Sequence, residues 1–405
     1  MGIEVPRFGA LEGVKVVSSG ISVAGPYAAS MMADQGADVT FVESPFIKDQ
    51  VRTTITPSFL DRERRNHKTM ALDMKQEKGR EVFLKLIAEA DIFVENSKAG
   101  AWAKRGFSDE VLWEVNPKLV ICHVSGFGQT GLPEYLERGS YDTIGQAMSG
   151  YMNFNGEPDG EPMPAPSYTC DYVCAMVASW SCLAAYIKAQ KTGEGESIDC
   201  CQYETMMMVN GYGLYDYLNC GMDHARSGSS SPTFAGCKNF KCKDGLIYVF
   251  WLSTPCFKEG LPLIGLEYGS EDFPEGIFTA GKGTPQGDKL DEALARYCAS
   301  KTVAEAEKEL NDHHVTAVAI LDWKGMAEHP QLAARGSISE WEGFRGEKVR
   351  GVGIVPQFTK HPGQIWRAAP HYGEDNRAIL EHLGYRPEEI EAMYEGKVVV
   401  EDSDF

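Results

Sequence analysis

The residue best placed for chemistry in this sequence is Asp171, which stands between an extended segment and a long apolar one. Three prolines lie between residues 162 and 166, and each fixes its own φ and keeps the preceding residue out of the α region. From residue 172 to about residue 190 the side chains are small, sulfur-bearing or aromatic, with no charge before Lys188. This pattern predicts a helix packed on most of its circumference, with Asp171 in its first turn.

A carboxylate at the start of a buried helix supports two interpretations. As an N-cap, Asp171 would accept hydrogen bonds from the free N–H groups of the first turn, and the helix dipole would favour its charge. As a poorly hydrated carboxylate among apolar side chains, it could act as a nucleophile or a base. Capping is the commoner use of Asp at this position, so residue type and spacing leave both interpretations open.

The overall charge of the chain restricts the partners that it can bind. The 405 residues carry a formal net charge of −19, which argues against nucleic acid or an anionic membrane as partner, since either requires a basic surface. An anionic small molecule must therefore meet a local basic cluster. The densest one spans residues 62–68 and includes Arg65 and Lys68. It is either a phosphate anchor or a solvated charged face.

A second group of cations follows the predicted strand 91–95. It consists of Lys98, Lys104 and Arg105, which come directly after the strand. Open α/β sheets bind their ligands at the carboxyl ends of the strands. These cations are therefore candidates for contact with an anionic ligand.

The elements that must position these groups follow a β-α-β pattern, which predicts a Rossmann-like parallel sheet with crossover helices. Strands are predicted at residues 14–17, 37–43, 69–72, 91–95, 119–125 and 197–199, with helices between most of them. The turn after the first strand contains Gly20 and Gly25, and Glu43 ends the second strand. The G-x-G-x-x-G spacing is absent, which argues against a nicotinamide cofactor.

The character of the sequence changes after residue 224. Residues 227–231 are Ser-rich, and the predicted elements beyond them are a strand pair at 239–251, a helix at 290–310 and a strand at 315–321. We expect a smaller α+β domain over residues 225–325, inserted into a discontinuous large domain of residues 1–224 and 326–405. A long connection from residue 323 then leads to a last helix at 375–383.

The cysteines and the N-terminus indicate the compartment. The 11 cysteines show no spacing typical of a metal site or a disulfide framework, so we expect reduced core residues and no metal. No run of 18 apolar residues, signal peptide pattern or myristoylation pattern is present. These features predict a cytoplasmic location.

Several motifs together resemble the class III CoA-transferases, a family that includes formyl-CoA transferase, carnitine CoA-transferase and bile-acid CoA-transferase. The similarity spans nearly the full length, and its specificity lies in the order and spacing of the motifs. They are Ala24-Gly25-Pro26, Arg65-Asn66-His67-Lys68, the segment 98–105, Ser125-Gly126-Phe127-Gly128-Gln129, Gln146-Ala147-Met148-Ser149-Gly150, the turn 168–171 and the segment 193–199.

The resemblance implies an enzyme of the EC 2.8.3 type that takes a CoA thioester as substrate and has no tightly bound cofactor. It implies an intertwined homodimer, in which each chain passes through the ring formed by the other. Asp171 falls on the catalytic aspartate of the family, which makes it the nucleophile. Lys98 and Arg105 match CoA-binding positions, and the region of Arg65 and Lys68 corresponds to the place where the adenosine end is received.

The chemistry of thioester attack and the resemblance each add one feature. The oxyanion of the reaction needs hydrogen-bond donors, for which the candidates are backbone N–H groups near Asp171 or in the loop 126–131, assisted by Gln129 or Gln146. The stretch 227–231 stands near the mobile glycine-rich flap of the family, although it contains a single glycine, Gly228.

Two rival functions are compatible with parts of this pattern. An α-methylacyl-CoA racemase pairs the equivalent aspartate with a histidine in a Gly-His-Asp motif, because moving an α-proton needs two bases. The matching segment here is Ser140-Tyr141-Asp142, which lacks the second base. A non-catalytic CoA-binding protein would keep the cations but would have no need of a carboxylate at position 171.

The acceptor acid is predicted from finer similarities. The segments 163–166, 216–219, 234–237 and 362–367 look closest to the carnitine enzymes, whereas 113–117, 149–152 and 375–377 are closer to the bile-acid enzymes. We favour a trimethylammonium acid such as carnitine or γ-butyrobetaine, with a bile acid as the alternative. Aromatic rings available for a cation–π cage are Tyr203, Tyr212, Tyr215 and Tyr217.

Overall fold

The computed structural model describes residues 3–53 and 57–402 and divides into two compact units. Unit 1 comprises residues 1–151, 165–211 and 333–405, and unit 2 comprises residues 152–164 and 212–332. Unit 2 thus begins and ends outside the predicted range 225–325 and also takes in the loop 152–164. Arg226 holds that loop, because its guanidinium donates hydrogen bonds to the carbonyl oxygens of residues 153, 157 and 160.

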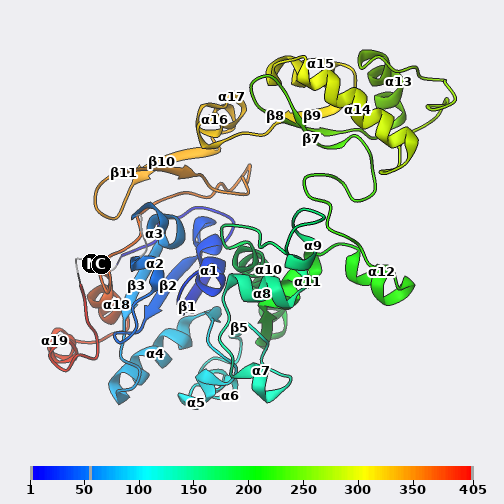
Figure 1. Cartoon of the computed structure of the whole chain (residues 1–405). Coiled ribbons are helices and arrows are strands. Elements are labelled where there is room, and N and C mark those ends of the chain that lie inside the picture. Colours follow the sequence, from blue (N-terminus) through cyan, green and yellow to red (C-terminus); the bar gives the residue numbers. More distant parts are fainter. Residues whose placement is uncertain (1–2, 54–56, 403–405) are drawn as a thin grey trace. The chain divides into compact units, whose positions relative to one another are not determined.

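A parallel sheet of six strands forms the centre of unit 1, in the order β3-β2-β1-β4-β5-β6 (Figure 1). The strands are β1 (Lys15–Ser19), β2 (Asp38–Glu43), β3 (His67–Ala71), β4 (Ile92–Glu95), β5 (Val120–Ser125) and β6 (Glu196–Cys201). The sequence-based prediction of an α/β fold with a parallel sheet is confirmed. Strands β2 and β3 are added on one side of β1, and β4, β5 and β6 are added on its other side, so the strand order switches between β1 and β4. The loops after β1 and β4 diverge there, which is where such sheets bind ligands.

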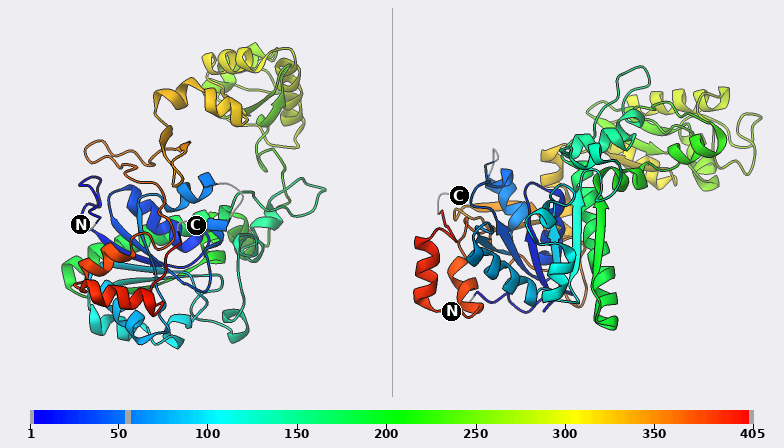
Figure 2. Two further views of the ribbon diagram at one scale, coloured as in Figure 1. Left: turned by 90° about the vertical axis from the view of Figure 1, so that its left-hand side faces the viewer. Right: turned by 90° about the horizontal axis from the view of Figure 1, so that it is seen from below.

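Helices cover both faces of this sheet (Figure 2). Successive strand residues point to opposite faces, so Val16 packs on one side and Val17 on the other. One face carries α1 (Ala24–Asp34) and α10 (Thr169–Thr192). The other carries α4 (Glu77–Glu89), α5 (Ala101–Lys104), α6 (Asp109–Val115), α18 (Asn376–His382) and α19 (Pro387–Glu395). The remaining helices of unit 1 are α2 (Gln50–Thr53), α3 (Pro57–Arg64), α7 (Pro133–Leu136), α8 (Asp142–Met148) and α11 (Gln202–Val209).

Helix α10 differs from its prediction in one respect, because only one of its faces is buried. The buried face carries small residues such as Cys174, Ala175 and Ala178, which allow close packing on α1 and β5. Met176, Trp180 and Ile187 are 49%, 57% and 56% exposed. Within a single chain, therefore, α10 is not buried on most of its circumference as predicted. By length and composition alone, α10 could also cross a membrane.

The connection after residue 323 also contains elements that the sequence pattern did not predict. They are α16 (Trp323–Glu328), α17 (Pro330–Ala334) and the antiparallel hairpin of β10 (Ile338–Glu342) and β11 (Lys348–Val352). The hairpin strands are short and carry charged residues throughout, which hides their alternating pattern.

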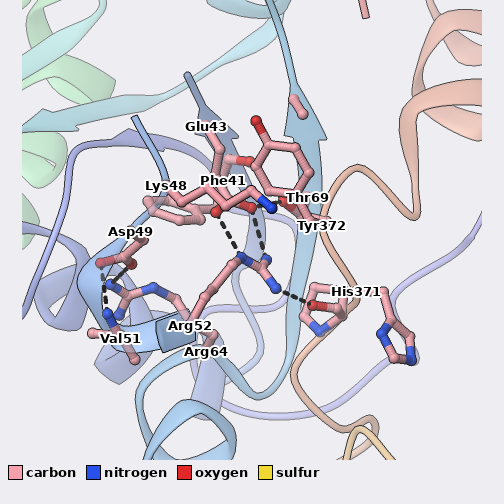
Figure 3. Close-up of polar contacts among 12 residues, drawn as sticks. Phe41, Glu43, Lys48, Asp49, Val51, Arg52, Arg64, Thr69, His371 and Tyr372 are labelled. Atoms are coloured by element: carbon pink, nitrogen blue, oxygen red, sulfur yellow. Dashed lines mark hydrogen bonds and ion pairs between the residues drawn. The ribbon is translucent and has the colours of Figure 1, made fainter. Parts of the chain in front are cut away.

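A buried ion pair at the carboxyl edge of the sheet also binds the C-terminal segment of the chain at Pro370 (Figure 3). Arg52 on α2 binds Glu43 at the end of β2 through two contacts, Nε to Oε1 and Nη2 to Oε2, each of 2.7 Å. Thr69 on β3 donates to Glu43 Oε2 at 2.6 Å, and Arg52 Nη1 donates to the carbonyl oxygen of Pro370 at 2.9 Å. Glu43 is thus fully engaged, whereas a dinucleotide-binding sheet would leave this acid for the ribose.

Unit 2 contains a three-stranded antiparallel sheet in the order β7-β8-β9. Its elements are α12 (Gly213–Cys220), β7 (Cys237–Lys241), β8 (Leu246–Phe250), α13 (Thr254–Leu263), α14 (Pro285–Ala299), α15 (Val303–Asp312), β9 (Thr316–Ala319) and α16; α9 (Tyr151–Phe154) and α17 span the boundaries with unit 1. The single helix predicted at 290–310 is two helices. Thr302 starts the second one by capping it together with Glu305 in a capping box, so the first must end before it.

Candidate active site

A cavity of about 200 Å³ lies in unit 1 at the carboxyl ends of β1, β4 and β5, at the switch point of the sheet. Its walls come from the loops that follow these strands, from the loop before α8 and from the starts of α10 and α11. The residues that line it are Ile21, Ser22, Ala24, Asn96, Ser97, Lys98, Ala99, Val124, Ser125, Gly126, Phe127, Gly128, Leu136, Arg138, Gly139, Ser140, Tyr141, Asp171 and Gln202.

Asn96 shapes the wall of this cavity by joining the loops after β1 and β4. Its Oδ1 accepts a hydrogen bond from the N–H of Ile21 at 3.1 Å, and its Nδ2 donates to the carbonyl oxygen of Ile21 at 2.7 Å. A Cβ at Gly20 would lie 1.9 Å from Asn96 Oδ1, and one at Gly25 would lie 2.8 Å from Asn96 Cβ. The two glycines therefore make room for an asparagine between the loops.

The capping interpretation of Asp171 is wrong, because another aspartate caps the helix. Asp142 Oδ1 accepts hydrogen bonds from the N–H of Cys170 at 2.7 Å and from the N–H of Asp171 at 3.2 Å. Tyr168 occupies the N-cap position with φ 59° and ψ 41° and makes no side-chain cap. Since Asp142 satisfies the first turn of α10, the carboxylate of Asp171 is available for other interactions.

The carboxylate of Asp171 lines the cavity and is almost completely shielded from water. The residue is 4% exposed, and its Oδ1 accepts a hydrogen bond of 2.6 Å from Gln202 Nε2. Burial, reinforced by the charge of Asp142 and to a lesser extent by that of Glu63, raises the pKa of Asp171 to about 7, while the bond from Gln202 acts in the opposite direction. At neutral pH a substantial fraction is therefore ionised yet poorly solvated, which suits a nucleophile.

Sequence reasoning missed both groups that hold Asp171. The sequence pattern marks Asp142 only as part of a segment that lacks a histidine, and none of the motifs includes Gln202. A signal for Gln202 was present, because it comes directly after β6 at the carboxyl edge of the sheet. No local pattern marks Asp142 as the cap of a helix that begins 27 residues later in the chain.

The structure separates the two glutamines predicted to stabilise the oxyanion, because the amide of Gln146 is bound by other groups and that of Gln129 is only partly bound. Gln146 is buried, and its amide donates to Asp142 Oδ2 at 2.6 Å and to the carbonyl oxygen of Ala165 at 3.0 Å, while accepting from the N–H of Ala165. Gln146 therefore supports the capping aspartate. Gln129 follows Gly128 of the cavity lining but does not itself line the cavity; its Oε1 accepts a hydrogen bond from the N–H of Gly100 at 3.3 Å, and its buried Nε2 makes no hydrogen bond within the described residues.

Of the predicted CoA-binding cations, Lys98 lies at the cavity. Its Nζ donates a hydrogen bond to the carbonyl oxygen of Glu137 at 2.7 Å. Arg105 is exposed at the end of α5, with its guanidinium 5.5 Å from the centre of the Trp102 ring, and it does not line the cavity.

The structure does not bring Arg65 or Lys68 to the cavity. The guanidinium of Arg65 is buried, binds the carboxylate of Asp34 at 2.6 Å and lies 5.0 Å from the centre of the Trp341 ring. Lys68 forms an ion pair of 2.6 Å with Asp38 near the amino ends of the strands. The basic run is thus largely neutralised by acids distant in the sequence.

The flap candidate and three of the four tyrosines belong to unit 2. Residues 227–231 are held by hydrogen bonds within that unit, from Gly228 N–H to the carbonyl oxygen of Gly156 and from Lys282 Nζ to Ser230 Oγ. Tyr212 packs edge-on against His224, and Tyr215 and Tyr217 are exposed on α12. Tyr203 is on α11 in unit 1, where it contacts Phe127 of the cavity wall.

Comparison with known proteins gives a consistent result. The sequence profile of CoA-transferase family III matches residues 11–376. A CaiB/BaiF family protein from Brucella suis is 28% identical, with a TM-score of 0.80 over 93% of this chain and 100% of that chain. A hypothetical protein from Mycobacterium tuberculosis is 22% identical, with a TM-score of 0.78 over 91% of this chain and 99% of that chain, and shares the fold.

Replacing Asp171 by Asn should stabilise the protein at alkaline pH. A carboxyl group whose pKa rises from 3.8 to about 7 on folding costs stability when it ionises, by up to about 4 kcal/mol. The cost is absent below pH 4 and grows as the pH rises to about 7. Asn carries no charge, so the stability of the variant should lack this decline. Urea unfolding at pH 5.5 and pH 8, at fixed protein concentration, measures the difference.

The control for this experiment is Asp159→Asn, which removes the charge of an exposed aspartate. It should leave the pH dependence of stability as it is in the wild type. An equal decline in wild type and Asp171→Asn would show that burial of this carboxylate carries no such cost.

Proposed function

Because the chain belongs to CoA-transferase family III, whose members act on acyl-CoA substrates, we propose that it moves CoA from an acyl-CoA thioester to a free carboxylic acid through a covalent intermediate on Asp171. The observation that carries this proposal is the state of the Asp171 carboxylate. It lines the cavity, it does not cap α10 because Asp142 does so, and burial raises its pKa to about 7.

The reaction follows from these properties. The ionised carboxylate attacks the carbonyl carbon of the thioester, the C–S bond breaks, and a mixed anhydride and a CoA thiolate are formed. The thiolate then attacks the aspartyl carbonyl, releases the donor acid and leaves CoA bound to Asp171 as a thioester. The acceptor acid reverses these steps and takes the CoA. One acid replaces another, so no ATP is needed, and exclusion of water prevents loss of the thioester by hydrolysis.

The oxyanion of the tetrahedral intermediates needs a hydrogen-bond donor at the cavity. Ser140 lines the cavity, and its buried hydroxyl makes no hydrogen bond within the part of the chain that the structure describes. We assign it this role in place of Gln146, which is bound elsewhere, and ahead of Gln129, whose buried Nε2 is also without a partner among the described residues but which does not line the cavity. A donor of this kind contributes about 3 to 4 kcal/mol in known cases.

The size and lining of the cavity favour a small acceptor acid. A volume of about 200 Å³ beside Asp171 is below the usual range for drug-sized ligands, and it suits a short-chain acid better than a bile acid. Phe127 and Tyr141 are the aromatic residues that line the cavity. Aromatic faces attract quaternary ammonium groups, so carnitine or γ-butyrobetaine is the acceptor class that we propose.

A racemase would need a second base opposite Asp171. The described residues that line the cavity include no histidine, and Asp142 is committed to capping α10. These observations favour acyl transfer over racemisation within the family.

We predict acyl exchange that depends on Asp171. Wild-type protein incubated with butyryl-CoA and a panel of free acids should produce new CoA thioesters with carnitine or γ-butyrobetaine, followed by mass spectrometry. Asp171→Asn should lose at least about 10³-fold in rate, because the covalent route is removed. The wild-type rate should rise with pH through about 7, as the carboxylate ionises.

Three outcomes separate the candidates. Exchange only among bile acids would keep the mechanism and change the acceptor. Exchange of the α-hydrogen of 2-methylacyl-CoA with deuterated solvent, without acyl transfer, would indicate a racemase. Full activity of Asp171→Asn would refute the proposed nucleophile.

We also propose that the protein is an intertwined homodimer. The exposed stripe of Met176, Trp180 and Ile187 on α10 supports an interface, because monomeric proteins rarely expose contiguous apolar surface. Ile144 and Met148 add exposed apolar side chains on α8.

An intertwined dimer makes a prediction that an ordinary dimer does not. Two differently tagged preparations mixed under native conditions should not exchange subunits, because threaded chains must unfold to separate. Trp180→Asp should prevent dimer assembly, as judged by light scattering, whereas Lys188→Ala on the same helix should not. A monomeric wild type, or exchange of subunits within minutes, would contradict the proposal.

A further inference from the structure

A buried histidine lies behind the cavity wall and contacts two carboxylates. His123 on β5 is paired in register with Glu95 on β4, and its Nδ1 lies 2.8 Å from Glu95 Oε1. Its Nε2 lies 3.0 Å from Oδ1 of Asp109, the first residue of α6. A neutral imidazole has one N–H group, so both contacts are hydrogen bonds only when the ring is protonated. The geometry is that of an imidazolium between two carboxylates.

Glu95 connects His123 to the cavity wall through a hydrogen bond to the backbone of Ser97. Its Oε2 accepts a hydrogen bond of 2.5 Å from the N–H of Ser97. Ser97 and Lys98 line the cavity, and Asn96 between Glu95 and Ser97 holds the neighbouring loop. Glu95 is 1% exposed, and a carboxylate buried so deeply requires a counter-charge, which His123 supplies.

We propose that protonated His123 is a positioning residue for CoA binding, because it fixes Glu95 and thereby orients the loop 96–98 so that Lys98 meets the phosphates of the CoA thioester. The inference rests on the proposed function, since CoA is the ligand. Because the imidazolium of His123 is held by Asp109 on one side and by Glu95 on the other, the Glu95 carboxylate has a single orientation. The loop 96–98, which Glu95 binds, then has one conformation.

The charges around the imidazole ring determine the pH at which His123 loses its proton. We call its ion pair with Glu95 the anchor of the loop 96–98. The groups that face it are Glu95 on β4, Asp109 on α6 and, as register neighbour on β6, Asp199, whose Oδ2 accepts a hydrogen bond from the N–H of Gln129. Burial lowers the pKa of His123, but the hydrogen bonds to Asp109 and Glu95 outweigh it and raise the pKa to about 9. The anchor is therefore present at neutral pH and is lost as the pH rises through about 9.

The test is titration of acetyl-CoA into the full-length protein by calorimetry, from pH 7.5 to pH 10. All proteins carry Asp171→Asn to prevent turnover. His123→Asn keeps a neutral donor but removes the charge, and should bind about tenfold more weakly at pH 7.5. The difference from the parent protein, which retains His123, should vanish by pH 10. The control is His382→Gln, which removes a histidine paired with Glu89 at 3.0 Å outside the cavity and should change nothing.

Kinetics in the protein that retains Asp171 give a second readout. His123→Asn should raise the KM for the CoA thioester, with kcat and the KM for the acid nearly unchanged. His123→Lys, which keeps a cation to higher pH, should retain binding above pH 9.

The outcomes distinguish this inference from the proposed function. Acetyl-CoA binding that is equal in the parent protein and in His123→Asn at every pH overturns the inference alone. Loss of binding in His123→Lys at the same pH as in the parent protein also overturns it, and this variant serves if the Asn variant does not fold. Failure of the parent protein to bind acetyl-CoA at any pH overturns both.

Discussion

The site depends on the pair of hydrogen bonds that Asp142 accepts from the N–H groups of Cys170 and Asp171. A helix that begins in the protein interior needs acceptors for its first N–H groups, and an aspartate in the first turn would ordinarily serve. Asp142, the first residue of α8, supplies these acceptors instead. The side-chain amide of Gln146 donates a hydrogen bond of 2.6 Å to the second carboxylate oxygen of Asp142. The carboxylate of Asp171 thereby faces the cavity with an amide donor as its hydrogen-bond partner.

The carboxylates at the carboxyl edge of the sheet show what sets Asp171 apart. Glu43 at the end of β2 is matched by the guanidinium of Arg52, and Glu95 at the end of β4 is matched by His123. Both are held by buried cations and serve to fix the loops around them. Asp171 is bound by the neutral amide of Gln202 and lies near the charge of Asp142. A carboxylate that is desolvated without a partner cation retains the reactivity that a stable ion pair would remove.

Much of the fold was predictable from the sequence, because strands buried on both faces are continuous apolar runs and the crossover helices have a clear period. The residue pattern marks Asp171 at the junction of an extended segment and an apolar helix but leaves cap and nucleophile open, and it is the resemblance to the catalytic aspartate of the family that indicates a nucleophile. The bonds that define the state of Asp171 were not predictable, because Asp142 and Gln202 approach it from other elements of the fold. The basic run around Arg65 was misleading for the same reason. Its partner Asp34 lies 31 residues earlier in the chain, and local charge density does not reveal such a pairing.

The central claim is that Asp171 becomes covalently bound to CoA, and trapping that species tests it most directly. The protein is incubated with an acyl-CoA in the absence of acceptor acid, quenched in acid, digested and examined by mass spectrometry, with a parallel sample treated with hydroxylamine. The account predicts CoA on the peptide that contains Asp171, conversion of that residue to a hydroxamate, and neither product in Asp171→Asn. CoA attached to a different residue, or rapid acyl transfer with no adduct at Asp171, would contradict it.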